Sequence, residues 1–310
     1  MTQAPLYAIA QGPDAGAGFY LRAADDVQLR LGLWQHKAAK GTVLLIPGRT
    51  EYIEKYGPAA ADLRARGFDT LVLDLRGQGL ADRPLGDRLT GHVVDFSEYQ
   101  LDIEAMIGFA RAKGLAEPYY LLSHSMGGCI ALRALMLGLG VQAAAFSAPM
   151  WGISMAAWLR PVASVIATAS RWFGLEGKYA PGTGAATYVL SQGFFGNTLT
   201  SDPDMWEFMR QQAEAQPDLT LGGPSLAWVD AALAECAALA RLPAPAMPCY
   251  TALGTAEKIV DTAPIHARMA GWKNGQLQLF AGAEHEVMME APATRKVVFD
   301  QIAALFDANR

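Results

Sequence analysis

The chain has 310 residues, of which 52% are hydrophobic and 18% charged, a balance that excludes a disordered protein. The formal net charge of −5 gives no reason to expect nucleic acid as a partner, and the length fits one large domain or a core domain with an insertion. The three cysteines, Cys129, Cys236 and Cys249, lack the spacing of a metal site, so we expect reduced thiols in a cytoplasmic protein.

Neither a secretory signal nor a membrane span is expected. The first residues lack a basic start followed by an apolar run. The nearest candidate for a span, residues 155–174, is interrupted by Arg160, Pro161 and Arg171. We therefore expect a cytoplasmic protein that does not cross a membrane, although peripheral contact with the inner membrane face is compatible with this sequence.

Predicted strands and helices alternate along most of the chain. Residues 18–35 predict a β-hairpin, and apolar strands then alternate with helical stretches. This order predicts a mostly parallel eight-stranded sheet with helices on both faces. The remaining predicted strands are 42–48, 70–79, 119–125, 143–149, 249–255 and 277–282, and the predicted helices lie within 55–66, 96–113 and 126–137 and after each of the last two strands.

The interval 151–242 breaks this alternation. It is helical and loop-rich in pattern, and prolines around residue 245 mark the return to the sheet. Five of the seven tryptophans fall in it: Trp151, Trp158, Trp172, Trp206 and Trp228. We predict that residues 1–150 and 243–310 form the core and that 151–242 form an inserted helical cap.

Reactive residues follow several predicted strands. The segment YYLLSHSMGGCI, residues 119–130, places Ser125 on a sharp strand-to-helix turn typical of a nucleophile elbow, although a plain tight turn would also contain serine. Glu257 follows a later strand, and His285 follows the last. Because ligands bind beyond the carboxyl ends of parallel strands, these side chains are expected to meet in the order nucleophile, acid, base.

Each residue type has a chemical reason to be there. A serine hydroxyl needs a base to take its proton, a neutral imidazole can do so, and a carboxylate orients that imidazole. Asp261 is an alternative acid, but it opens a predicted helix and suits an N-cap, so Glu257 is preferred. The backbone N–H groups of Met126 and Arg49 are the predicted oxyanion donors.

These segments resemble the α/β-hydrolase superfamily, and within it the monoacylglycerol lipases and bacterial lysophospholipases. The resemblance is carried by LLIPGRTEYIEKY, VLDLRGQGLADRP and GHVVDFSEYQLDIEAM, and by FSAPMWGI and GGPSLAWV in the cap. Ser123 stands where the family has Gly, and Ala81 where it has Ser. The resemblance implies an α/β-hydrolase fold and hydrolysis of an acyl ester through an acyl-serine formed by Ser125, His285 and Glu257.

The resemblance also implies a single-chain lipid ester as substrate, foremost a lysophospholipid, with no metal and no cofactor. Glu51 of the first motif and Trp151, Phe194 and Trp228 of the cap are candidate substrate-binding residues. A monoacylglycerol lipase or general carboxylesterase is the alternative within enzymes. A ligand-binding protein that kept the fold without turnover is the alternative from another class.

Overall fold

The computed structural model describes residues 2–155, 170 and 172–310, and its described part is built on one nine-stranded sheet. The order across the sheet is β1-β2-β3-β5-β4-β6-β7-β8-β9. The strands are β1 (Thr2–Ala4), β2 (Ala17–Arg22), β3 (Gln28–Trp34), β4 (Thr42–Ile46), β5 (Asp69–Asp74), β6 (Tyr119–His124), β7 (Ala144–Ser147), β8 (Cys249–Gly254) and β9 (Gly275–Phe280). The six neighbouring strands β5, β4, β6, β7, β8 and β9 run parallel to one another. On the other side of β5, the strands β3, β2 and β1 extend the sheet, each antiparallel to its neighbour.

The predicted mostly parallel α/β sheet is confirmed, with one strand more than expected. The additional strand is β1, which pairs with β2 in the register Thr2↔Tyr20. Three residues are too few to show the alternation of apolar and polar side chains by which strands are recognised in a sequence. The predicted hairpin is present as β2 and β3.

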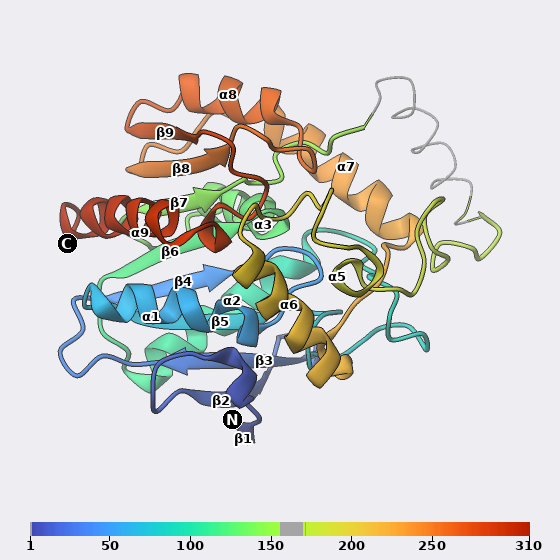
Figure 1. Ribbon diagram of the computed structural model, residues 1–310, viewed down its shortest axis with the longest axis horizontal. Helices are drawn as coiled ribbons and strands as arrows, with labels where there is room; N and C mark the ends of the chain where they lie inside the picture. Colours follow the sequence, from blue (N-terminus) through green and yellow to red (C-terminus); the bar gives the residue numbers. More distant parts are fainter. Residues whose placement is uncertain (1, 156–169, 171) are drawn as a thin grey trace.

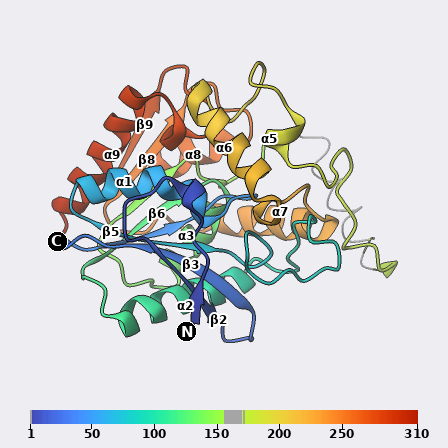
Figure 2. The same cartoon turned by 60° about the horizontal axis from the view of Figure 1, so that its bottom comes forward.

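Helices cover both faces of the sheet (Figures 1 and 2). Helices α1 and α9 supply apolar side chains to one buried cluster, and α2, α3 and α8 supply them to the other. Their bounds are α1 (Gly57–Ala65), α2 (Glu98–Lys113), α3 (Met126–Met136), α8 (Thr262–Ala270) and α9 (Pro292–Asp307). Since both faces are covered, the central strands are buried along their whole length, as their uninterrupted apolar runs predict.

The described part of the interval between β7 and β8 lies beyond the carboxyl ends of the parallel strands (Figure 1). Its described elements are α5 (Tyr188–Ser191), α6 (Pro203–Ala215), the 3₁₀ turn η3 (Pro217–Leu219) and α7 (Leu226–Ala240). Asp202 caps α6, and Ser225 caps α7 by accepting from the N–H of Trp228. The predicted cap therefore has helices in its described part, while Trp158 falls outside the described residues and the cap boundaries stay a prediction.

Two further features bear on the sequence-based expectations. Among the described helices, none combines the length and the apolar character needed to cross a bilayer. Cys129, Cys236 and Cys249 are buried and free of disulfides.

Candidate active site

Ser125 sits on a strained turn between β6 and α3. Its backbone has φ 50° and ψ −120°, a conformation that L-residues with side chains rarely adopt. The two glycines that follow allow close approach: a Cβ on Gly127 would lie 2.3 Å from the carbonyl oxygen of Ile46, and one on Gly128 would lie 2.5 Å from Pro149 Cβ. This is the geometry of a nucleophile elbow.

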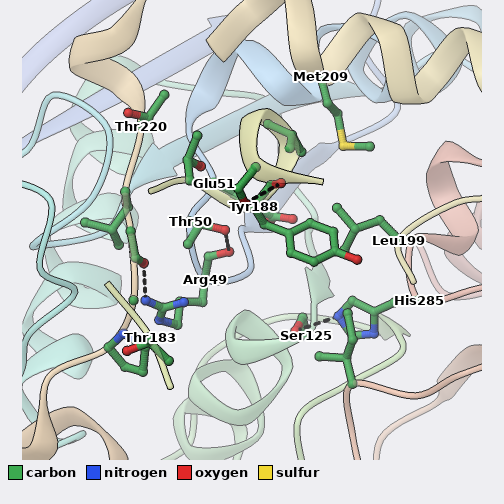
Figure 3. A pocket seen from close by; sticks show the side chains of 18 of the residues that line it. Arg49, Thr50, Glu51, Ser125, Thr183, Tyr188, Leu199, Met209, Thr220 and His285 are labelled. Atoms are coloured by element: carbon green, nitrogen blue, oxygen red, sulfur yellow. Dashed lines mark hydrogen bonds between the residues drawn. The ribbon is translucent and has the colours of Figure 1, made fainter. Parts of the chain in front are cut away.

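The side chains of Ser125, His285 and Glu257 form one hydrogen-bonded chain. His285 Nε2 lies 2.9 Å from Ser125 Oγ (Figure 3), and His285 Nδ1 lies 2.6 Å from Glu257 Oε2. Because a carboxylate only accepts, Nδ1 carries the proton and Nε2 is left to accept from the serine hydroxyl. The three residues come from the ends of β6, β8 and β9, which the parallel sheet brings to one edge.

The Glu257 carboxylate is held from a second side. Its Oε1 accepts from the backbone N–H groups of Ile259, at 2.6 Å, and Val260, at 3.1 Å. Burial raises the pKa of Glu257, but the hydrogen bond and charge of His285, with these two N–H groups, outweigh burial and hold it below its usual value. The carboxylate is therefore kept ionised next to the imidazole.

Asp261, the alternative acid, takes another position. It is the N-cap of α8, and its side chain accepts from the N–H of Ala263 at 3.1 Å. The predicted capping role is confirmed. The structure brings Glu257, rather than Asp261, to His285.

The loop after β4 is anchored around Arg49. The N–H of Gly48 donates to Glu51 Oε2, and the side-chain amide of Gln78 donates to Gly48 O at 2.9 Å while accepting from Thr50 N at 2.9 Å. Arg49 lies between these anchored residues, and Met126 is the first residue of α3. The backbone on both sides of Arg49 is thus held in place, and Met126 begins the helix that follows the elbow; that their N–H groups form an oxyanion site stays a prediction.

A buried group of charged side chains packs beneath this loop. Lys55 Nζ lies 2.5 Å from Glu51 Oε1 and 2.5 Å from Glu286 Oε1, and His124 Nε2 lies 3.2 Å from Glu286 Oε2. Burial lowers the pKa of His124, but the charges of Glu286 and Glu51 outweigh this and raise it. Burial raises the pKa of Glu286, and the charges of His124 and Lys55 bring it well below its usual value. The group therefore holds two carboxylates around the Lys55 ammonium and a histidine whose protonated form they favour.

His124 comes directly before Ser125 in the chain. Its ring packs against His285, with 4.7 Å between ring centroids, and lies on the wall of the same cavity. Its Nδ1 donates to Ser147 O at 3.0 Å, because a carbonyl can only accept. Lys55, Gln78 and Glu286 had not been selected from the sequence at all, since their partners are distant along the chain.

The charged group also brings together three side chains of types that bind metal ions. Ligand atoms of Glu51, His124 and Glu286 lie within 4.8 Å of one another. The Lys55 ammonium contacts both carboxylates, so the position of a cation between them is already taken by a side chain. These residues therefore do not fit a metal ion.

Ser125 and His285 open into a cavity of about 590 Å³. Figure 3 shows Tyr188, Leu199 and Met209 on one side of the pocket and Arg49 with Thr183 on another. Further apolar lining comes from Met150, Ile153, Val189, Ile259 and Val260. A volume in this range suits a ligand of modest size whose apolar part lies against the cap.

Two of the four predicted substrate-binding residues line the cavity and two do not. Glu51 and Trp228 are on its wall. Trp151 is a core residue: it is 2% exposed, donates from Nε1 to Gly128 O at 3.1 Å and stacks on Trp272. Phe194 packs instead against the cluster around Trp206. The structure therefore gives Trp151 and Phe194 no place on this cavity wall, and the physical reason is that aromatic composition does not distinguish a pocket wall from a core.

The sheet, the elbow and the order of the site residues along the chain define an α/β-hydrolase. Residues 37–292 match the model of the family described as serine aminopeptidase, S33. The chain belongs to this family.

Curated relatives align over most of the chain. Lysophospholipase L2 of Escherichia coli K12 is 30% identical over 295 residues, which is 92% of this chain and 86% of that protein. The probable lysophospholipase L2 of Haemophilus influenzae is 28% identical over 267 residues, covering 86% and 83% of the two chains.

Solved structures agree on the fold. A soluble variant of monoglyceride lipase from Saccharomyces cerevisiae superposes with a TM-score of 0.71 at 20% identity, covering 94% of each chain. A carboxyl esterase from Bacillus coagulans superposes with a TM-score of 0.76 at 15% identity, covering 96% of this chain and 99% of that one. At such identities the likeness concerns the fold alone.

Proposed function

We propose that this protein is a serine hydrolase that cleaves the carboxylic ester of a lysophospholipid. The observation that carries the proposal is the continuous chain from Ser125 Oγ through His285 to Glu257, at 2.9 and 2.6 Å, which opens into a largely apolar cavity. Nucleophile, base and orienting acid are each within hydrogen-bond reach of the next, as acyl transfer through a serine requires.

The reaction proceeds in two acyl transfers. His285 Nε2 takes the proton of Ser125 as Oγ bonds to the ester carbonyl carbon, and the N–H groups of Arg49 and Met126 hold the resulting oxyanion. His285 then gives its proton to the departing glycerol oxygen, which leaves the acyl group on Ser125. A water, deprotonated by His285, releases the fatty acid and restores the serine. Glu257 stabilises the imidazolium formed in each step.

Two observations support a single-chain lipid. The curated relatives at 30% and 28% identity are named lysophospholipases. The cavity also has an apolar wall that includes Tyr188, Leu199 and Met209, which suits one acyl chain, while the polar side chains of Arg49, Thr183 and Thr220 lie on another side.

The direct test compares three substrates at equal concentration: a lysophosphatidylethanolamine, the monoacylglycerol with the same acyl chain, and a short nitrophenyl ester. We expect the highest kcat/KM for the lysophospholipid. A preference for monoacylglycerol would replace the proposal with a monoglyceride lipase. Failure of the folded protein to cleave any of the three would favour a binding protein without turnover.

A further inference from the structure

The side chain of Arg49 extends along the wall of the catalytic cavity. Figure 3 shows its guanidinium beside Thr183, on the side away from Leu199 and Met209. The group lies 5.3 Å from the ring centre of Trp228, over its face, and Nη2 donates to Gly222 O at 2.5 Å. The guanidinium is thus fixed in place by a ring and a carbonyl oxygen, both neutral.

No carboxylate in the described part of the chain balances this charge. In the described ranges of the chain Arg49 makes no ion pair, and the residues outside them, 1, 156–169 and 171, include neither Asp nor Glu. Its Nε is shut off from solvent and has no acceptor among the described residues. Burial lowers the pKa of Arg49 to about 10. Arg49 is half-buried, and a partly desolvated cation without a counter-ion is costly, so the site favours an anion that arrives from outside.

The Lys55 ammonium, also on the cavity wall, differs from Arg49 because it has carboxylate partners. Lys55 is held between Glu51 and Glu286, at 2.5 Å from each, so its charge is already balanced. Of the two, only Arg49 lacks a carboxylate partner among the described residues, and its Nε has no acceptor there. A guanidinium presents planar paired donors that match the oxygens of a phosphate, and such bonds are stronger than neutral ones.

We propose that the Arg49 guanidinium binds the phosphate of the lysophospholipid whose acyl ester lies at Ser125. This inference rests on the proposed function and assigns its head-group specificity to one side chain. The acyl chain then lies along Leu199 and Met209, the ester at Ser125, and the phosphate between Arg49 and Thr183. A monoacylglycerol has no anion for Arg49 and leaves the cation unbalanced.

The test measures inhibition and turnover in Arg49→Met and Arg49→Lys. The inhibitors, assayed against nitrophenyl ester hydrolysis, are an ether-linked lysophospholipid, the ether-linked alkylglycerol of the same chain, and inorganic phosphate. Turnover is measured as the ratio of kcat/KM for a lysophospholipid over its matching monoacylglycerol. Because both readouts compare two ligands in one variant, they cancel any loss that the mutation causes in the oxyanion loop.

Arg83→Met is the matched control. Arg83 also lacks an acceptor for Nε, donates to Gly79 O at 2.7 Å and has its pKa lowered to about 10 by burial, but it does not line the cavity. We expect Arg49→Met to raise the inhibition constant of the ether lysophospholipid, relative to the alkylglycerol, roughly 10- to 150-fold, the range of a hydrogen bond to a charged group. Arg49→Lys should recover part of the difference, and Arg83→Met should change neither ratio.

Equal effects of Arg49→Met on both ligand classes would overturn the inference, as would a control variant that behaves like Arg49→Met. Inhibition by millimolar inorganic phosphate that disappears in Arg49→Met, with no change for the ether lipid, would assign the site to free phosphate and also overturn it. A wild-type protein that cleaves neither lipid would contradict the proposed function, whereas the inhibition ratio would still report on Arg49.

Discussion

Gly127→Ala should damage both the fold and the reaction, because the elbow and the oxyanion loop are packed backbone to backbone. The added Cβ would lie 2.3 Å from Ile46 O and 2.4 Å from Pro47 O, where real contacts stay above 3.0 Å. The first gap must therefore widen by at least 0.7 Å, from 2.3 to 3.0 Å. Both contacting oxygens are main-chain atoms, so either β4 or α3 has to move as a whole to make room.

The size of the effect follows from that displacement. Overpacking of this kind costs about 1–3 kcal/mol of the free energy of unfolding. Pro47 leads directly into Gly48 and Arg49, so the same movement shifts a proposed oxyanion donor. A displacement approaching 1 Å lowers rates by up to about a hundredfold, and we expect kcat on a nitrophenyl ester to fall roughly ten- to a hundredfold.

Gly108→Ala provides the matched control. Gly108 lies inside α2, and a Cβ there meets nothing within 4 Å. This variant should gain about 0.5–1 kcal/mol in stability and keep its rate, because alanine is the better helix former. Denaturant unfolding and ester hydrolysis measure both quantities. A Gly127→Ala protein with wild-type stability and kcat would refute the packing argument.

Three other predictions concern the site. Glu257→Gln should lower kcat by several orders of magnitude, because His285 loses its orienting partner. Asp261→Asn should cost about 1 kcal/mol of stability or less, since Asn also caps helices. If kinetics and unfolding show the reverse for the two variants, the acid is misassigned. Because the pKa of Glu257 is held below its usual value, its carboxylate should stay ionised as pH falls toward 5, so only the general base should limit log kcat/KM in that range, with a slope of one. A slope of two above pH 5 would contradict this. Leu199→Trp should shift the dependence of kcat/KM on acyl-chain length about tenfold toward short esters. Trp151→Phe should cost about 1–3 kcal/mol of stability and leave that dependence unchanged. If only Trp151→Phe changes it, the acyl chain lies elsewhere.

The parts of the site that follow strand ends could be predicted from the sequence. Apolar runs locate the strands, and in a parallel sheet their carboxyl ends share one edge, so Ser125, Glu257 and His285 could be expected together. The capping role of Asp261 was also predictable, because an N-cap is a local pattern. What these residues have in common is that short-range sequence features fix their positions.

The parts that depend on long-range packing could not be predicted. The side-chain hydrogen bond from Lys55 to Glu286 joins residues 231 positions apart, and no local sequence pattern marks either partner. Trp151 follows β7 within the aromatic-rich interval, yet it packs under α3 against Trp272. Whether an aromatic side chain faces a cavity or a core depends on how the elements pack, which the residue type does not reveal.

Covalent labelling tests the central claim, that Ser125 is the nucleophile, most directly. The protein is treated with a fluorophosphonate probe and the modified peptide is located by mass spectrometry. We predict a single adduct on Ser125, its absence in Ser125→Ala, and a fall in ester hydrolysis of roughly 10⁴-fold or more in that variant. Ser123→Ala is the control, because Ser123 is fully buried two residues away and should leave labelling intact. A folded Ser125→Ala protein that still takes up the probe and hydrolyses the ester would contradict the account.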